Sequence, residues 1–354
     1  RWPSFLKFRK NRLPAPTDDY WYMPYGATQT TTAGIRVDEQ TAVKYLTVFS
    51  CVSLIAGDVA NLPLILYRRL PGGGKERAID HPKYDLCHTA VNDEITARSW
   101  IESELTHILL YGNSYSLKVF NGIGKLMALW PISNPAAVEV DRGKDGRLHY
   151  KWRSSNGVEV DKTRDEILHI PGWGYDGIRG MSPISIAREA IGLGFATEEY
   201  GERFFGNGTH PSGMITMPPE AEAMDEELQK AYLKNFREQY SGMGKTHTMM
   251  LMLNGEKYQP LTMPLNDAQF LESRQFQKLE IAGMYHVPPH KIAVHGANSN
   301  YNNEEQENRG YVDSCLMSWL RRLETSKNQQ ILTKNERLGG YFYEFLVDGL
   351  LRGD

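Results

Sequence analysis

The sequence from Met181 to Pro218 constrains the fold most, because it predicts a long helix that contains several glycines. Ser182 followed by Pro183 is typical of a helix start, since a serine hydroxyl can cap free main-chain amides and proline has the φ of a first turn. The run GNG at 206–208 is typical of a helix end. A glycine inside a helix costs about 1 kcal/mol relative to alanine. Close packing of a second helix is the usual compensation, so the segment predicts a packing surface and not an active site.

The predicted helix carries two sets of residues. An apolar stripe recurs every three or four residues and consists of Ile186, Ala190, Leu193, Thr197, Tyr200 and Phe204. The small residues are Ala187, Ala190, Gly192, Gly194, Ala196 and Gly201. The stripe is an ordinary feature of an amphipathic helix, whereas the small residues indicate that a neighbouring helix approaches closely.

The length and charge of the chain limit its class. At 354 residues it exceeds the usual size of one compact domain, so we expect two or three units that each form a core. Charged residues make up 23% and hydrophobic residues 41%, which is close to globular averages. The formal net charge of -3 argues against a protein that wraps nucleic acid electrostatically. Any contact with nucleic acid should therefore be loose.

Cysteine usage and hydropathy indicate the compartment. Cys51, Cys87 and Cys315 are far apart and odd in number, so they predict neither a disulfide framework nor a metal-binding pair. No signal peptide is evident at the first residues, and the most apolar run, 49–67, contains Asp58 as well as an asparagine and a proline. These observations predict a soluble protein of a reducing cytoplasm, without membrane contact.

The first half of the chain predicts an α+β arrangement after an extended arm. Residues 1–34 contain four prolines and several basic residues, and they predict a segment without its own core. Ser99 and Glu102 match the S-x-x-E capping box, which predicts a helix start. The expected elements are a helix over 38–57, a strand over 62–70, a helix ending at Gly112, and hairpins that turn at 121–124 and 144–146.

The second half contains a small segment between long helices. Residues 210–263 are only about 50 in number, near the lower limit for an isolated domain, so we expect this segment to complete its core against another subunit. The expected elements are a charged helix over 225–240, a helix over 267–285, a polar loop HGANSNYNN at 295–303, a long helix from Asn302 or Asn303 and a strand over 341–351.

Motifs for catalysis or metal binding are weak. Gly244, Lys245 and Thr246 match the end of a Walker A loop, but Gln239 stands where that motif has its first glycine, so a hairpin turn is the simpler interpretation. A nucleotide-dependent nucleic-acid enzyme that uses this loop remains the alternative. Two groups of residues lack the spacing of metal ligands; they are His81, Cys87 and His88, and His286, His290 and His295. The adjacent carboxylates at 165–166 and 198–199 have no evident nucleophile beside them. We expect no catalytic residue, no metal and no cofactor.

Seven phrases along the chain are informative together. They are TVFSCVSLIAGDVANLPL (47–64), LLYGNSY (109–115), LHIPG (168–172), GMSPISIAREAIGL (180–193), RFFGNGTHPSGMI (203–215), DAQFLESRQFQKLEIAGMYHVPPHKI (267–292) and DGLLRGD (348–354). In this order the chain resembles the portal (connector) protein family of tailed bacteriophages, in its long-tailed-phage (HK97-type) branch. Each phrase alone is weak, but seven in the family's order cover the chain nearly end to end.

The resemblance implies an α+β portal fold with a mixed α/β wing, a helical stem, a small α/β clip and a long helix after a tunnel loop, assembling as a ring. The implied divisions are an N-terminal arm (1–35), the first part of the wing (36–181), a stem helix (182–209), the clip (210–263), a returning stem helix (264–289), the tunnel loop (290–303), and the long helix with a final wing strand (304–354). Relatives usually continue into a helical crown, so we expect the crown to be absent here.

The resemblance also implies a function that is not enzymatic. The ring, usually of twelve subunits, would occupy one capsid vertex of the virion after assembly in the host bacterial cytoplasm. It would conduct double-stranded DNA during packaging and ejection. Its implied partners are the terminase large subunit, a head-tail adaptor, and the major capsid and scaffolding proteins. A monomeric scaffold that shares only ancestry with portals is a further alternative.

Three groups of site residues follow from the resemblance. In the tunnel loop, His295, Asn298, Ser299, Asn300, Tyr301 and Asn302 would contact DNA transiently, although a flexible loop without contacts is the simpler interpretation. In the stem, the six small residues from Ala187 to Gly201 would pack between subunits. On the clip helix, Lys230, Lys234 and Arg237 would dock a partner, although their spacing also fits an ordinary amphipathic helix with Glu226, Glu227 and Glu238.

Overall fold

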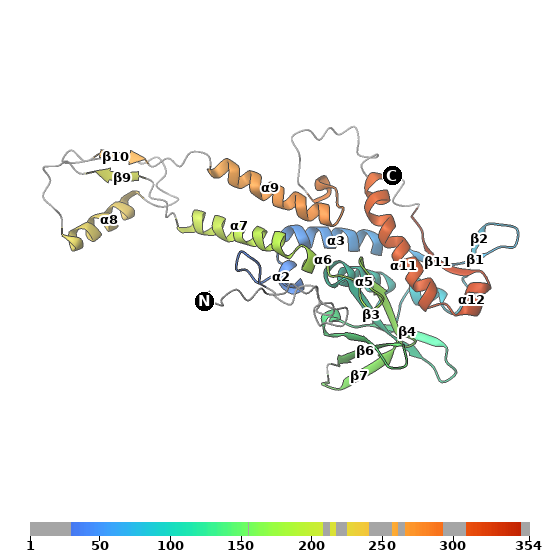
Figure 1. The fold of residues 1–354 in the computed structure, drawn as a ribbon. Coiled ribbons are helices and arrows are strands. Elements are labelled where there is room, and N and C mark those ends of the chain that lie inside the picture. The colour runs from blue at the N-terminus through green and yellow to red at the C-terminus, as the bar shows by residue number, and fades with distance from the viewer. Residues whose placement is uncertain are drawn as a thin grey trace, which may run out of the picture. The chain divides into compact units, whose positions relative to one another are not determined.

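The computed structural model describes residues 30–154, 156–207, 213–216, 225–240, 257–260, 266–292 and 309–347. The chain divides into two compact units. Unit 1 comprises Arg1–Ala196 and Arg274–Asp354, and unit 2 comprises Thr197–Ser273. Both boundaries lie within long helices, α7 (Arg188–Asn207) and α9 (Asn266–Met284), so each helix contributes residues to both units (Figure 1).

Unit 1 contains most of the described elements. Its helices are α2 (Glu39–Ala42), α3 (Leu46–Ala60), α4 (Tyr84–His88), α5 (Ala97–Tyr111), α6 (Pro183–Ile186), α11 (Met317–Gln330) and α12 (Lys334–Leu338), with a π-helical turn η4 (Val312–Leu316) and 3-10 turns η1 (Pro135–Ala137) and η2 (Pro289–Ile292). Its strands are β1 (Leu64–Arg69), β2 (Lys75–Arg77), β3 (Asn113–Phe120), β4 (Leu126–Pro131), β5 (Glu139–Arg142), β6 (Leu148–Arg153), β7 (Glu159–Thr163), β8 (Ile167–Pro171) and β11 (Tyr341–Phe345).

The strands of unit 1 form three small antiparallel sheets, with orders β11-β1-β2, β4-β3-β8 and β5-β6-β7. The pairing of β1 with β11 brings Leu64 opposite Phe345, so the C-terminal segment completes a sheet that begins near the N-terminus. The two predicted hairpins are confirmed as β3-β4 and β5-β6, and the final strand is confirmed as β11. The expected α+β class is therefore confirmed.

The hydrophobic core that the structure describes lies in unit 1. The larger cluster surrounds the packed helices α3 and α5, and it includes the fully buried Trp100, Ile55 and Leu64 (Figure 1). A second cluster, around Tyr115 and Tyr150, lies between the β3 and β6 sheets. Burying each such large apolar side chain contributes roughly 1.5–3 kcal/mol.

The helix predicted over 38–57 is two helices, because each has its own start. Asp38 caps α2 in a capping box with Thr41, and α3 begins only at Leu46. Not every large apolar residue of α3 is buried. Leu46 is 70% exposed and Phe49 is 52% exposed, since α3 buries the face that contains Val48 and its successors toward α5.

The capping box predicted at Ser99 is wrong. Helix α5 begins two residues earlier than Ser99, with Thr96 as the N-cap, and the Thr96 side chain accepts a hydrogen bond from the Ser99 amide. The Thr96 side chain precedes the first turn in extended backbone, as an N-cap requires, and Ser99 lies inside the helix. The predicted end at Gly112 is confirmed, where φ is 73°.

The helix predicted from Ser182 is interrupted at Ala187. Ser182 is the N-cap of the short helix α6, as expected, and α7 continues from Arg188. The predicted helix over 267–285 is confirmed as α9. In the described part of the long helix expected after the loop, Tyr311, Cys315 and Leu323 are buried. Among the helices that the structure describes, none combines the length and apolar character needed to cross a bilayer.

Unit 2 is described as helix α8 (Glu226–Tyr240), the antiparallel pair β9 (Gly213–Thr216) and β10 (Lys257–Pro260), and parts of α7 and α9. The charged helix predicted over 225–240 is thus confirmed. The run HTMMLML at 247–253 lies outside the described residues.

The end of the predicted N-terminal arm packs against unit 1. Thr31 is 5% exposed, and Thr32 donates hydrogen bonds to Glu189 of α7 from its amide, at 3.1 Å, and from its hydroxyl. The prediction was a segment without its own core, and the described end of this segment packs onto α7 through a buried threonine and a hydrogen-bonded carboxylate.

Candidate functional site

Three of the phrases that carry the resemblance meet at one junction in unit 1, at the start of helix α6. Gly112 follows α5, Gly172 follows β8, and Gly180 precedes α6. The Gly172 amide donates to the Gly112 carbonyl at 2.7 Å. A Cβ on Gly112 would lie 2.1 Å from the Met181 carbonyl oxygen, so only glycine fits there. The junction thus fixes the position at which α6 begins relative to β8 and the end of α5.

Side chains complete the junction. The Asn113 amide donates to the Gly180 carbonyl at 2.8 Å, and its oxygen accepts from the Gly180 amide at 2.7 Å. The Ser182 hydroxyl accepts from the Ser185 amide at 3.2 Å and lies 2.8 Å from the Leu110 carbonyl and 2.9 Å from Glu39 Oε1. Its single proton can serve only one of those two acceptors at a time. Buried polar groups of this kind hold a backbone path in one arrangement.

A neutral histidine supports Asn113. His169 Nε2 lies 3.0 Å from Asn113 Oδ1, and His169 Nδ1 lies 3.2 Å from the Tyr150 hydroxyl. Because the Asn113 oxygen is an acceptor, the network assigns the proton to Nε2 and leaves Nδ1 to accept from Tyr150. Burial lowers the pKa of His169 to about 3, with the cations Arg164 and Arg179 adding to the effect. The imidazole is therefore neutral at physiological pH.

The C-terminal helix also holds this junction. Arg322 of α11 donates to the carbonyls of Pro171 and Gly172 at 3.0 and 2.7 Å. Gln330 exchanges two hydrogen bonds with the main chain of His169, at 3.0 and 2.7 Å. The segment that leads into α6 is therefore held by hydrogen bonds to elements from both halves of the sequence.

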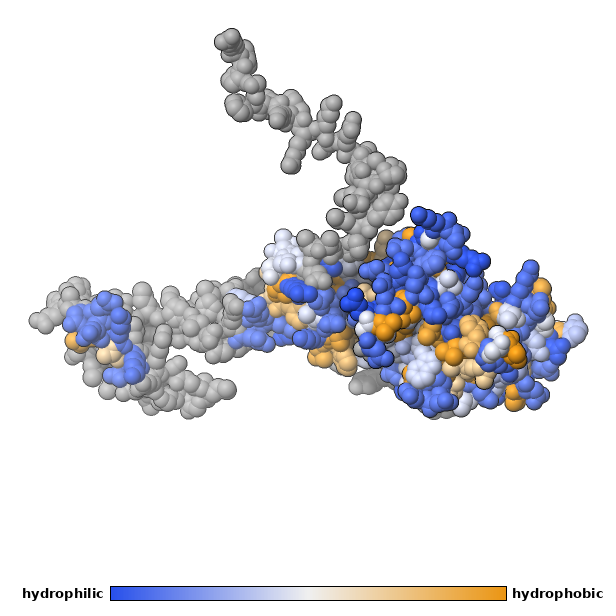
Figure 2. Space-filling view, turned by 90° about the horizontal axis from the view of Figure 1, so that it is seen from below, coloured by the Kyte–Doolittle hydropathy of each residue, from blue (hydrophilic) through white to orange (hydrophobic). Residues whose placement is uncertain are grey.

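The stem helix has a face toward unit 1 and an exposed face. Ile184 and Ile191 are fully buried, whereas Ile186, Leu193 and Tyr200 are 52%, 50% and 52% exposed. Their spacing of seven residues places Leu193 and Tyr200 on one side of α7. Of the predicted stripe, these three residues are exposed, Ala190 and Thr197 are partly exposed, and the Phe204 side chain lies outside the described residues. Figure 2 shows hydrophobic patches on a mostly hydrophilic surface on this side of the described residues.

Two glycines of α7 are covered by side chains of the same chain. A Cβ on Gly192 would lie 2.4 Å from Thr31 Cγ2, and a Cβ on Gly194 would lie 2.8 Å from the Tyr45 ring. Contacts within one chain therefore account for these two glycines. Their packing between subunits stays a prediction, as it does for the partly exposed Ala187, Ala190 and Ala196 and for the buried Gly201.

The returning helix α9 shows the same division. Ile281, Ala282 and Tyr285 are buried, and the Tyr285 hydroxyl donates to the Leu109 carbonyl at 3.1 Å. Phe276 and Leu279 are 59% and 43% exposed. Within unit 1, both stem segments thus bury one apolar face and expose another.

The other predicted sites are only partly described. Lys230 forms an exposed ion pair with Glu226 at 2.8 Å, as an ordinary amphipathic helix would, and Lys234 is exposed. The Arg237 side chain, the loop residues from His295 to Asn302 and the Walker-like run at 244–246 lie outside the described residues. Among the described residues, no group of three His, Cys, Asp or Glu side chains is arranged to hold a metal ion.

Sequence reasoning missed the junction itself. Asn113, His169 and Arg322 are separated by 56 and more residues, and nothing local links them. The sequence feature that could have indicated the junction is a glycine in each of three phrases, LLYGNSY, LHIPG and the phrase that begins at Gly180.

Comparison with known proteins finds phage portal proteins among the relatives of this chain. The portal protein of Enterobacteria phage HK97 is 28% identical over 321 residues, which are 90% of this chain and 74% of that protein. The probable portal protein of Streptomyces phage phiC31 is 29% identical over 332 residues, covering 91% of this chain and 71% of that protein.

Solved structures share the fold. A chain from the neck of an empty gene transfer agent particle has a TM-score of 0.69 at 22% identity, covering 88% of this chain and 85% of that one. An HK97 family phage portal protein from Corynebacterium diphtheriae has a TM-score of 0.59 at 14% identity, covering 92% and 98%. The family model described as phage portal protein matches residues 46–354. The chain therefore belongs to the phage portal protein family.

Proposed function

We propose that this chain forms a ring, of twelve subunits, at one vertex of a phage capsid and that the ring conducts double-stranded DNA. The observation that carries the proposal is the exposed apolar stripe of Ile186 on α6 and Leu193 on α7, two helices that bury Ile184 and Ile191. Exposed apolar surface of this kind marks interaction sites. The solved neck structures, computed with C6 and C12 symmetry, support a cyclic assembly in which the stripe packs against a second copy.

The ring is tested with Leu193→Glu. A carboxylate at a position that is half exposed in one chain leaves the monomer fold intact but would be buried in a subunit interface, where an unpaired charge is costly. We expect native mass spectrometry to show rings for the wild type and smaller species for the variant. Ile123→Glu, at an 87% exposed turn position, is the matched control and should keep its rings. Rings of unchanged size and stability in Leu193→Glu would contradict the proposal.

The proposed divisions follow the family, with a wing over 36–181 and 304–354, stem helices at 182–209 and 264–289, a clip at 210–263 and a tunnel loop at 290–303. We propose that the tunnel loop, from His295 to Asn302, contacts DNA in passage. Deleting 298–301 should leave rings intact and reduce DNA packaging in an in vitro packaging reaction. Unchanged packaging and DNA retention would remove this assignment.

We propose that the clip docks the terminase large subunit and, later, a head-tail adaptor, through Lys230, Lys234 and Arg237. Replacing all three with Glu should abolish co-purification of the terminase while rings persist. The outer wing would contact the major capsid and scaffolding proteins. The ring would assemble in the host cytoplasm and remain at the vertex of the virion.

We further propose that the chain is not an enzyme and needs no cofactor, because the family role requires none. The alternative, a nucleotide-dependent enzyme with its loop at 244–246, predicts ATP turnover by the purified chain. Turnover that Lys245→Ala abolishes would establish the alternative, and its absence at micromolar protein would exclude it.

A further inference from the structure

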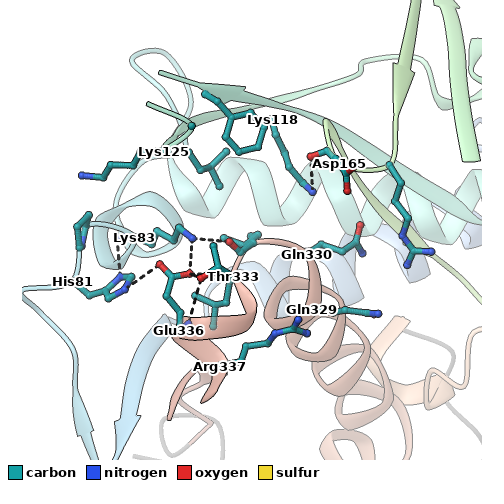
Figure 3. Close-up of a pocket in the computed structure, with 17 residues that line it drawn as sticks. His81, Lys83, Lys118, Lys125, Asp165, Gln329, Gln330, Thr333, Glu336 and Arg337 are labelled. Atoms are coloured by element: carbon teal, nitrogen blue, oxygen red, sulfur yellow. Dashed lines mark hydrogen bonds and ion pairs between the residues drawn. The ribbon is translucent and has the colours of Figure 1, made fainter. Parts of the chain in front are cut away.

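Unit 1 contains a cavity of about 610 Å³ that ring formation does not explain. It lies between the β3-β4 hairpin, the turn before α4, and the end of α11 with α12 (Figure 3). Its volume is in the range that holds small ligands or peptide side chains. Five cationic side chains line it, against the two carboxylates of Asp165 and Glu336; the cations are Lys83, Lys118, Lys125, Arg164 and Arg337.

One carboxylate of the cavity is fully engaged within the chain. Glu336 Oε2 accepts from Lys83 Nζ at 2.7 Å and from the Thr333 amide and hydroxyl at 2.7 and 2.9 Å, and Glu336 Oε1 lies 3.4 Å from His81 Nε2 (Figure 3). Lys83 donates also to the Ile331 carbonyl at 2.9 Å. The Lys83–Glu336 pair is therefore structural, and it closes one end of the cavity.

Lys118 is engaged much less. Lys118 is 8% exposed, and its ammonium donates a hydrogen bond to the main-chain carbonyl of Asp165 at 3.3 Å. Among the residues that the structure describes, no ion pair joins Lys118 to a carboxylate. The Asp165 carboxylate instead faces solvent, where it is 84% exposed and lies 3.5 Å from Arg147. Figure 3 shows Lys118 and Asp165 on the same wall of the cavity.

A buried ammonium with one long hydrogen bond is unusual. Such a group has three donors, and buried charges in proteins are ordinarily paired because removing them from water is costly. Burial lowers the pKa of Lys118 to about 8, so the amine is still largely charged at neutral pH. The exposed Asp165 carboxylate attracts Lys118 and opposes the fall in its pKa, but it forms no ion pair with the ammonium. The described part of the chain therefore compensates the positive charge in the cavity only in part.

Apolar side chains border the cavity and favour a protein over a nucleic acid. Phe120 lines the cavity and is 43% exposed. Leu126, Ile331 and Leu332 also line it. A phosphate backbone gains nothing from such a border, whereas a peptide can bury apolar side chains there and place one carboxylate inside.

We propose that this cavity is a docking site for an acidic segment of a partner protein, in which one Asp or Glu carboxylate enters the cavity and pairs with Lys118 while flanking apolar side chains cover Phe120. The charge complementarity of the cavity selects the carboxylate, and the apolar border selects its neighbours. All lining residues belong to unit 1, so the site is complete in one chain and does not depend on the proposed ring.

A random heptapeptide display library tests the site. Selection on the wild type, with counter-selection on Lys118→Met, should enrich peptides that carry one Asp or Glu beside Leu, Ile or Phe. Fluorescence anisotropy of an enriched, labelled peptide should then show at least tenfold weaker binding to Lys118→Met. Lys144→Met, at an exposed hairpin turn outside the cavity, is the matched control and should bind as the wild type does.

Three results would overturn the proposal. They are selection without enrichment of acidic residues, equal binding by the Lys118→Met variant, and equal binding of the same peptide with Gln in place of its acid. A 12-base-pair DNA duplex and inorganic phosphate are run in parallel, and preferential binding of either through Lys118 would also contradict it. Circular dichroism of both variants checks that they are folded. Ring formation is measured separately, so loss of rings and loss of peptide binding are distinguishable.

Discussion

Two of the buried lysines of unit 1 are compensated in opposite ways. Lys327 of α11 is fully buried, its ammonium lies 2.6 Å from Glu104 Oε2, and it sits 4.1 Å from the centre of the Trp100 ring. Lys118 of β3 is nearly as buried but has only the Asp165 carbonyl as a described partner. The first charge is compensated inside the fold, and the second is compensated poorly.

The difference separates a structural role from a binding role. The Lys327–Glu104 pair joins α11 to α5, so it fastens the C-terminal helix to the core of unit 1. Burial raises the pKa of Glu104, and the adjacent Lys327 opposes that rise. Breaking such a pair leaves one uncompensated buried charge, which costs more than the pair contributes. At Lys118 the same cost is already present in the chain, and a ligand could remove it.

The largest expected effect is that of Glu104→Gln. It leaves Lys327 buried without a counter-charge, so the free energy of unfolding should fall by about 3–5 kcal/mol in urea denaturation. The double variant Glu104→Leu with Lys327→Met should recover most of that loss. Glu102→Gln, which breaks an exposed pair with Arg98 on the same helix, is the control and should cost under about 1 kcal/mol. Equal losses at positions 102 and 104 would refute the distinction between exposed and buried pairs.

His107 provides a third case, a partly buried group that avoids the cost by remaining neutral. Burial lowers its pKa from 6.5 to about 4. The unfolded chain therefore binds a proton that the folded chain does not, and stability falls as the pH drops from 6.5 toward 4, by roughly 3 kcal/mol for this residue. His107→Phe keeps the ring contact with Tyr111 and should flatten this loss in denaturation curves measured across pH.

His149 is the control for the sign of the histidine effect. Its hydrogen bond to Asp161 raises its pKa, so its contribution to stability is present below pH 6.5 and is lost as the pH rises through the raised pKa. His149→Gln should therefore steepen the loss of stability on acidification. A flattening in both variants would show that the slope does not come from buried neutral imidazole.

The smallest effect should come from Lys118→Met, and its sign is reversed. Because burial lowers the pKa of Lys118 to about 8, folding at neutral pH carries the cost of a buried charge. The variant should be more stable than the wild type by about 1–2 kcal/mol at pH 7. The difference should shrink as the pH rises from 8 toward 10.5, where the folded wild type loses its proton before the unfolded chain does. Thermal melts of Lys118→Met and Lys144→Met at pH 7 and pH 10 measure this difference in stability. If Lys118→Met were less stable than the wild type, Lys118 would have a structural role like that of Lys327.

Local sequence signals predicted most of the elements but not all of their boundaries. The hairpin turn at 144–146 follows from turn chemistry within a few residues, and Ser182 caps α6 as expected. The predicted start of α5 was wrong because Thr96 and Ser99 both suit an N-cap. The packing of α5 against α3 decides which of the two residues begins the helix. Competing local signals of equal strength are decided by tertiary packing.

Side-chain partners distant in sequence could not be predicted. The α7 glycines indicated a close neighbour, yet nothing local identified Thr31 and Tyr45 as the groups that approach them. The cation at Lys118 was not singled out at all, since one lysine in a strand gives no indication of its burial. The junction of Asn113, His169 and Gly180 likewise required three chain segments to be placed together.

The sequence by itself determined the α+β class, the order of the helices and strands and, through its seven phrases, the family. These depend on hydrophobic periodicity, caps and turns, which act over a few residues. Only the tertiary structure decided which lysine is paired, which histidine is neutral and which face of the stem helix is exposed. Charge compensation and burial depend on contacts between segments far apart in the chain, so they exist only once the chain has folded.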